Sequence, residues 1–274
     1  MFSKSAKTRS YLAILIALLS IMVVMPCIDV HNDLINNLVL SVFLLLFLLA
    51  AIKVTITEGV APRKPLYKWG IRATIIIAFI ADLGQSVLYT VLGNKEELYL
   101  WSAGLFHLSG EAFWLHLLSF IAVIGYTLLI LSLIFMIIRD LFSGSRVTVN
   151  KIFGAIVAYL LLGLLWAFLY CLFEFLEPGT IIRDGGARIA SFAEAQYFSF
   201  TTLCTVGYGD IVPHSDLAMV FANLESVAGQ LYLAILVARL IGLYTSHRSK
   251  DQPEGEHPAK QESGRGQRNA GIID

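Results

Sequence analysis

Charged side chains are scarce in this sequence, and neither sign is in excess. The 274 residues include 20 Lys and Arg and 20 Asp and Glu, so that 15% are charged while 57% are hydrophobic. This composition lies outside the usual range of soluble globular proteins and indicates a membrane protein. Without a basic or acidic excess, the sequence predicts neither nucleic-acid binding nor a strongly acidic partner.

Cysteine is scarce as well, and histidine is not grouped with other catalytic residue types. The three cysteines, Cys27, Cys171 and Cys204, lie in or beside apolar segments and lack metal-ligand spacing. His107 and His116 are isolated, and no nucleophile, base and orienting group occur together. We therefore expect no resident metal or cofactor, and we do not expect an enzyme.

Six apolar runs with almost no charge are long enough to cross a membrane. A hydrocarbon core of roughly 30 Å needs about 20 helical residues, at about 1.5 Å per residue. The predicted spans are 11–28, 34–52, 71–92, 113–138, 152–176 and 217–244. The predicted fold class is an all-α membrane protein with six transmembrane helices.

Basic residues gather in alternate loops, which predicts the orientation of the chain. They precede the first span and follow the second, fourth and sixth spans. By the positive-inside rule these loops and both termini are cytoplasmic, in a multi-pass protein of the cell membrane, and the loop between spans five and six is outside. Two other interpretations are less favoured. A cleaved signal peptide lacks its A-x-A pattern, and the apolar segment 98–111 is too short for a span and is interpreted as interfacial.

Between spans five and six, a short predicted helix is followed by chain unsuited to a helix. Ser191 with Glu194 matches a capping box, which predicts a helix over 192–203 of roughly 18 Å, about half of the membrane's thickness. Extended chain at about 3.3 Å per residue recovers about 16 Å over 205–209. We therefore predict a re-entrant loop, whose non-helical backbone must be shielded by protein or line a water-filled path.

The sequence TVGYG at 205–209 suits a water-filled path. Gly207 and Gly209 tolerate positive φ, so the backbone can turn successive carbonyl oxygens to one side and form a cation site. Residues 202–210 read TLCTVGYGD. They match in full the pattern T-x-x-T-x-G-Y-G-D, so this segment resembles the pore region of potassium channels. Tyr197 and Phe198 stand where the pore helix of that family usually carries aromatic residues.

The resemblance implies roles for the residues of this selectivity filter. The carbonyl oxygens of Thr205, Val206, Gly207 and Tyr208, with the Thr205 hydroxyl, would replace the hydration shell of K⁺. The side chains of Val206 and Tyr208 would turn away from the ion and brace the backbone. Asp210 would bond to the pore helix behind the filter, although an outer anion that concentrates cations is an alternative.

Other residues around the filter are expected to support it. Thr202, Tyr197 and Phe198 belong to the pore helix, and Gly209 completes the filter. Cys204 replaces a Thr often found there, which puts a hydroxyl contribution to the inner cavity in doubt. Only one pore signature occurs. The resemblance therefore implies a homotetramer in the lipid bilayer, with K⁺ as its permeant ligand.

The last span contains polar and flexible residues whose roles stay open at this point. Gly229 is either the hinge glycine that the resemblance implies or a site of close helix packing. Gln230 would face the water-filled cavity. Glu225 is an ionisable group inside the membrane, and it is either functional or a protonated structural acid behind the filter.

Three regions are predicted along the chain. Residues 1–145 form a four-helix transmembrane domain, 146–247 form the pore domain, and 248–274 form a disordered cytoplasmic tail. The fourth span resembles the voltage-sensing position of six-helix channels, but 112–138 contains no Lys or Arg. We therefore expect no voltage sensing by arginines. Asp82 in the third span is assigned no function.

The favoured hypothesis is a tetrameric channel that conducts K⁺ passively and selectively. A non-selective monovalent cation channel keeps the pore but disagrees with the intact G-Y-G sequence. A secondary transporter would be expected to contain inverted repeats and paired interrupted spans, and only one interrupted region is present.

Overall fold

The computed structural model describes residues 6–27, 76, 80, 111–142, 148–189 and 191–251. The elements in these ranges are α1 (Ala6–Cys27), α4 (Glu111–Phe142), α5 (Val149–Leu176), β1 (Ile181–Arg183), α6 (Phe192–Leu203), β2 (Ile211–Pro213) and α7 (Asp216–Asp251). The predicted spans at 34–52 and 71–92 lie outside the described residues, except for Ile76 and Ile80. Asp82 and residues 98–110 lie outside them too.

Three of the described helices are long and apolar enough to cross a membrane. They are Leu117–Phe142 within α4, Val149–Leu176 of α5 and Asp216–Arg239 within α7. In α1 the apolar stretch Tyr11–Val23 is shorter. Membrane helices are therefore confirmed where spans four, five and six were predicted, and the total of six stays a prediction.

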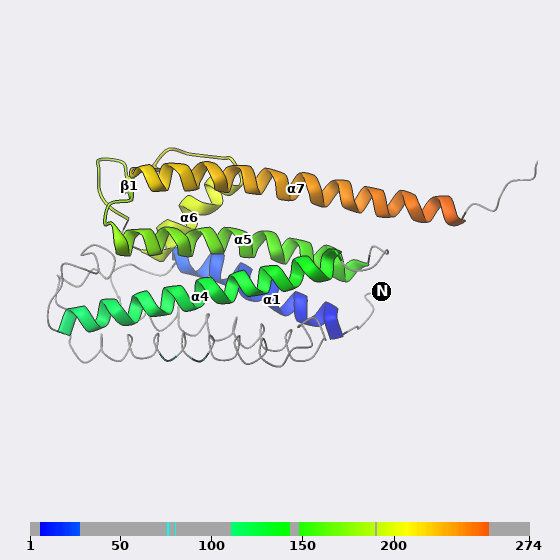
Figure 1. Ribbon diagram of the computed structural model, residues 1–274, viewed down its shortest axis with the longest axis horizontal. Coiled ribbons are helices and arrows are strands. Elements are labelled where there is room, and N and C mark those ends of the chain that lie inside the picture. Colours follow the sequence, from blue (N-terminus) through cyan, green and yellow to red (C-terminus); the bar gives the residue numbers. More distant parts are fainter. Residues whose placement is uncertain are drawn as a thin grey trace, which may run out of the picture.

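Helix α5 is the centre of the described structure. It contacts α1, α4, α6 and α7, and Figure 1 shows it between α4 and α7, with the short α6 beside it. Its sequence is apolar on all sides, and residues around its whole circumference are buried, among them Leu161, Ala167 and Tyr170. A helix that is hydrophobic on all sides is stable when other helices or lipid surround it. The sequence of α5 therefore agrees with its central place.

Close packing, rather than removal of apolar surface from water, stabilises these helix contacts. Lipid tails are as apolar as leucine, so helices in a membrane associate through van der Waals contact at small residues. A Cβ atom on Gly154 would lie 3.5 Å from the ring of Tyr11 in α1, and one on Gly163 would lie 2.6 Å from the ring of Phe200 in α6. The glycines of α5 thus let α1 and α6 approach its backbone.

The described structure is mostly helical, as expected, and it also contains a small two-stranded sheet that the sequence did not predict. Strand β1 pairs antiparallel with β2, with Ile182 opposite Val212. In the sequence, β1 precedes α6 and β2 follows the segment 205–209. Ile181 and Ile211 are buried, so extended chain is stabilised here by strand pairing and by burial against the helices. The sheet joins the loop before α6 to the chain after the filter.

A buried carboxyl group holds the turn that follows α5. Glu174 is completely buried. Its Oε1 accepts a hydrogen bond from the backbone N–H of Gly179 at 2.6 Å, and its Oε2 accepts one from the N–H of Thr180 at 3.0 Å. The carbonyl of Thr180 in turn accepts from the N–H of His214 at 2.8 Å. The end of α5 is therefore tied to the chain that enters α7.

Helix α7 is longer than predicted. It continues to Asp251, so residues 248–251 of the expected disordered tail are helical. The sequence RSKD contains no glycine or proline, and the first proline is Pro253, before which helices tend to stop. The remainder of the predicted tail, 252–274, lies outside the described residues. Figure 1 shows α7 extending past the other labelled helices.

Arg239 joins α7 to the end of α4. Its Nη2 donates to the carbonyl oxygen of Leu141 at 3.1 Å, and its guanidinium lies 4.3 Å from the centre of the Phe142 ring. The last carbonyls of a helix have no partner within that helix, and a cation there also interacts favourably with the helix dipole.

We expect replacement of Glu174 by Ala to destabilise the outer turn. The buried amide of Thr180 and the half-buried amide of Gly179 would lose their acceptor, and a buried amide left without one costs about 1–3 kcal/mol. The midpoint of thermal unfolding of the detergent-purified protein should fall clearly. The control is Glu177→Ala, because the Glu177 side chain is exposed and its loss should change stability by less than about 0.5 kcal/mol. Equal midpoints for the two variants would contradict the proposed role of Glu174.

Candidate pore loop

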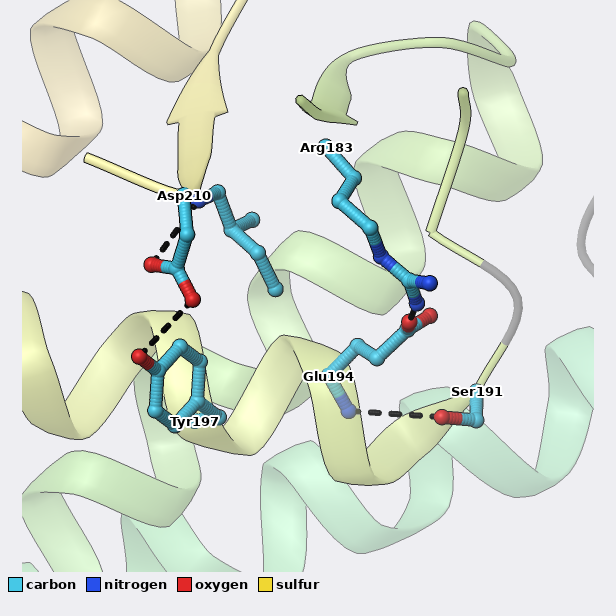
Figure 2. A network of polar contacts seen from close by, with 6 residues as sticks. Arg183, Ser191, Glu194, Tyr197 and Asp210 are labelled. Atoms are coloured by element: carbon cyan, nitrogen blue, oxygen red, sulfur yellow. Dashed lines mark hydrogen bonds and ion pairs between the residues drawn. The ribbon is translucent and has the colours of Figure 1, made fainter. Parts of the chain in front are cut away.

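The helix predicted over 192–203 is confirmed with the predicted bounds. Helix α6 runs from Phe192 to Leu203, and the Ser191 side chain accepts a hydrogen bond from the N–H of Glu194. The carboxylate of Glu194, the other residue of the predicted capping box, forms an ion pair with Arg183 of β1. Figure 2 shows the Glu194 side chain directed at Arg183.

The backbone after α6 folds back onto the last carbonyls of that helix. The N–H of Thr205 donates to the carbonyl of Thr202 at 2.9 Å. The N–H groups of Val206 and Gly207 both donate to the carbonyl of Thr201, at 2.8 and 3.2 Å. These bonds satisfy carbonyls that the end of a helix leaves free.

These hydrogen bonds fix the direction of the neighbouring carbonyl groups. No cis peptide bond occurs in the described residues, and in a trans peptide unit the C=O points opposite to the N–H. Because the N–H groups of Thr205, Val206 and Gly207 point to α6, the carbonyls of Cys204, Thr205 and Val206 point away from it. One face of the segment therefore carries a row of peptide oxygens.

The φ angles of the segment alternate in sign. They are positive at Thr205 (58°), Gly207 (55°) and Gly209 (82°), and they are not positive at Val206 or Tyr208. Positive φ was expected at the two glycines and is confirmed there. Thr205 was not expected to adopt it, since this conformation costs a residue with a Cβ about 1–2 kcal/mol. The hydrogen bond from its N–H to the carbonyl of Thr202 helps to hold it in this conformation.

The side chains of Val206 and Tyr208 are exposed in the single chain, although one face of the Tyr208 ring is packed. Val206 is 51% and Tyr208 is 70% exposed. The Tyr208 ring nevertheless stacks on Tyr197 of α6, with centroids 6.1 Å apart and an interplanar angle of 7°. Tyr208 thus turns toward α6, while the described chain leaves its outer face uncovered.

Asp210 is bonded to the pore helix. The hydroxyl of Tyr197 donates to its Oδ2 at 2.9 Å, and the N–H of Ile211 donates to its Oδ1 at 3.1 Å. Its carbonyl accepts from the N–H of Asp184 at 3.0 Å. Figure 2 shows Tyr197 on α6 directed at this carboxylate. Of the two interpretations of Asp210, the structure contains the bond to α6.

The other predicted support residues also lie behind the filter. Phe198 is buried, and its ring centroid is 4.9 Å from that of Tyr170 in α5. Thr202 contributes its backbone, since its carbonyl accepts from the Thr205 N–H and, at 3.3 Å, from the hydroxyl of Ser226 in α7. The expected supports are therefore brought together around α6.

Of the three residues singled out in α7, Gly229 and Glu225 are buried and Gln230 is exposed. Gly229 is buried, and a Cβ atom on it would lie 2.4 Å from the carbonyl oxygen of Leu203. This gives Gly229 a packing role, and its hinge role stays a prediction. Gln230 is exposed. Glu225 is completely buried and bonded to α5 and α6.

Several residues of the site were missed from the sequence. Thr201 accepts two filter amides through its backbone, which no side-chain pattern reveals. Ser199 and Tyr170 bond to Glu225, 26 and 55 residues away in the sequence. A hydroxyl group in a strongly apolar helix is a signal that could have identified Ser199 and Tyr170. It could not have shown that both bond to Glu225.

Comparisons with known proteins agree with this geometry. Residues 153–246 match the family described as ion channel. The inward rectifier potassium channel Kirbac3.1 of Paramagnetospirillum magnetotacticum is 34% identical over 87 residues, which are 32% of this chain and 27% of that protein. The two-pore potassium channel 3 of Arabidopsis thaliana is 27% identical over 125 residues, 42% of this chain and 26% of the relative.

A third relative is the voltage-gated potassium channel Kch of Escherichia coli strain K12, 33% identical over 115 residues, 41% of this chain and 25% of the relative. The chain thus spans about a quarter of the length of the curated relatives it matches. No solved structure gives a significant match. The predicted resemblance to the pore-loop family of potassium channels is confirmed by these matches.

We expect Gly229→Ala to lower stability and Gly242→Ala, on the same helix, to leave it equal or higher. The new Cβ at 229 would overlap the backbone of Leu203, and overpacking typically costs about 1–3 kcal/mol. At Gly242 nothing lies within 4 Å of the new Cβ, so the helix gains up to about 1 kcal/mol from the better helix former. Thermal unfolding of both purified variants checks this. An unfolding midpoint for Gly229→Ala at or above that of Gly242→Ala would contradict the close contact.

Proposed function

We propose that this protein, whose residues 153–246 match the ion channel family, is a homotetrameric channel that conducts K⁺ selectively and passively. The observation that carries the proposal is the backbone of 205–209. Its N–H groups at Val206 and Gly207 bond to Thr201, and its carbonyls at Thr205 and Val206 therefore point away from α6. The sign of φ alternates along it.

Peptide oxygens in this arrangement suit a potassium ion that has shed its water. In the proposed filter, carbonyls of Thr205, Val206, Gly207 and Tyr208 and the hydroxyl of Thr205 replace the hydration shell. No charged side chain belongs to 205–209, so the ion is held by dipoles and can leave again. The C-terminal end of α6 adds a partial negative charge below the filter.

One chain supplies oxygens on only one side of such an ion, so the working channel requires several copies. The exposed faces of Val206 and Tyr208 are available for neighbouring chains. Only 11% of the apolar window of α7 is buried, against 50% for α5. Its exposed residues Leu217, Val220, Leu224, Val227 and Leu231 follow one another at spacings of three and four, and therefore share one helix face. We assign this face to contacts between the copies in the tetramer.

The filter and its outer turn are assigned to the outside of the cell membrane, with both termini in the cytoplasm. Gating by arginines of the fourth helix is not part of the proposal, because 112–138 contains no Lys or Arg. Gly229 as a hinge and Gln230 at the cavity complete the proposed inner helix.

The test of this function is ion flux through the purified protein in liposomes. Uptake of K⁺ and Rb⁺ should exceed that of Na⁺, and barium should block it. Equal uptake of K⁺ and Na⁺ would favour the non-selective cation channel. Uptake that requires a counter-transported solute would favour the transporter.

We expect Gly207→Ala to abolish the preference for K⁺ over Na⁺ in this assay. Alanine at φ 55° introduces strain of about 1–2 kcal/mol in every subunit. Gly186→Ala is the matched control, because Gly186 also has positive φ (81°) and open space around it, but it lies in the outer loop. That variant should keep the selectivity of the parent. If Gly207→Ala protein retained the parent's K⁺ selectivity, the proposed filter would be wrong.

A further inference from the structure

Three helices meet at a buried carboxyl group behind the proposed filter. Glu225 of α7, Ser199 of α6 and Tyr170 of α5 are each completely buried. The hydroxyl oxygen of Tyr170 lies 2.7 Å from Oε2 of Glu225. The hydroxyl oxygen of Ser199 lies 2.5 Å from Oε1 of Glu225 and 2.7 Å from the carbonyl oxygen of Gly163 in α5.

The number of protons in this cluster indicates the state of the carboxyl group. Three oxygen–oxygen contacts as short as these are hydrogen bonds, and each needs a proton of its own. Tyr170 and Ser199 carry one hydroxyl proton each, and the Gly163 carbonyl can only accept. If Tyr170 donates to Glu225 and Ser199 donates to Gly163, the third proton must come from Oε1 of Glu225, which then donates to Ser199.

The surroundings of Glu225 agree with a neutral group. Its titratable neighbours on α5 are Tyr170 and, further along that helix, Tyr159, and Cys204 at the end of α6 bonds to Tyr159 at 3.6 Å. Among the described residues, no Lys, Arg or His forms an ion pair with Glu225. A buried carboxylate without a cation is strongly disfavoured, because its lost hydration is not replaced.

We propose that Glu225 is protonated in the working protein and that its proton joins α7 to the pore helix, which makes it a proton-dependent positioning residue for the filter. Loss of the proton would place a negative charge among three helices and leave two oxygen atoms facing each other without a proton between them. The functional consequence rests on the proposed channel function.

Position in the fold explains how this bond would affect the filter. Ser199 precedes Thr201, the acceptor of two filter amides, by two residues. Gly229, one helical turn after Glu225, contacts Leu203 at the end of α6. The bond from Glu225 and the contact at Gly229 therefore fix α7 against both the middle and the end of the pore helix. Loss of the hydrogen bond between Glu225 and Ser199 would therefore alter the position of Thr201, which accepts the amides of Val206 and Gly207.

The first test compares Glu225→Gln with Glu225→Ala in the liposome flux assay. The Gln amide can accept from Tyr170 and donate to Ser199, as the protonated carboxyl does, so flux should stay within about twofold of the parent. Alanine leaves two buried hydroxyl groups without their partner, and K⁺ flux should fall about tenfold or more.

The pH profile distinguishes a proton-dependent role from a merely structural one. Between about pH 6 and about pH 9, below the range in which tyrosine titrates, K⁺ flux through the parent should fall at least about fivefold in symmetric buffers. Flux through Glu225→Gln should change less than about twofold, because the amide does not titrate over this range. If Glu225→Gln lost flux as Glu225→Ala does, or kept the parent's pH profile, the proposal would be overturned.

An infrared measurement separates this inference from the channel function. The spectrum of the parent minus that of Glu225→Gln, both detergent-purified at neutral pH, should contain the carbonyl stretching band of a protonated carboxylic acid. A difference spectrum with only carboxylate bands overturns the inference, whatever the flux. If the band is present and the parent shows no K⁺ flux, the proton assignment stands and the channel function fails.

Discussion

The arrangement of the pore loop depends on where the backbone amides after α6 find their acceptors. Non-helical backbone at membrane depth is tolerated only when its polar groups are paired or face a polar path. The end of a helix offers unpaired carbonyls, and Thr201 and Thr202 accept the amides of Thr205, Val206 and Gly207. This pairing satisfies both partners. It also turns the opposite ends of the peptide units, the carbonyl oxygens, away from α6, to the side of the proposed ion path.

Two sets of contacts hold this segment from its two ends. At the outer end, Tyr197 bonds to Asp210, and the sheet of β1 and β2 ties the preceding loop to the chain after the filter. At the inner end, Gly229 lets α7 reach the carbonyl of Leu203. Between them Glu225 joins all three pore helices. The segment 205–209 is therefore held within a frame built by α5, α6 and α7, most of which lies in the residues 153–246 that match the ion channel family.

The described helices outside that frame are connected to it mainly through α5. Helices α1 and α4 contact α5, and the bond from Arg239 to Leu141 connects the distal half of α7 with the end of α4. A change in the position of α4 would therefore reach the inner helix at Arg239 as well as through α5. Residues 112–138 of α4 contain no Lys or Arg. The match to the ion channel family covers residues 153–246, so α1 and α4 lie outside it.

The sequence alone determined those features that depend on local chemistry. The length of apolar runs predicted α4, α5 and α7, Ser191 and the apolar pattern predicted α6 with its bounds, and the two filter glycines predicted positive φ. Tertiary structure decided what depends on distant partners. These are the choice between the two roles of Asp210, the packing of Gly229, the positive φ of Thr205, the β1–β2 sheet and the burial of Glu225 against Ser199 and Tyr170. The reason is that a cap, a span or a glycine acts within one or two turns of chain, whereas the partner of a buried hydroxyl or carboxyl is set only when helices pack.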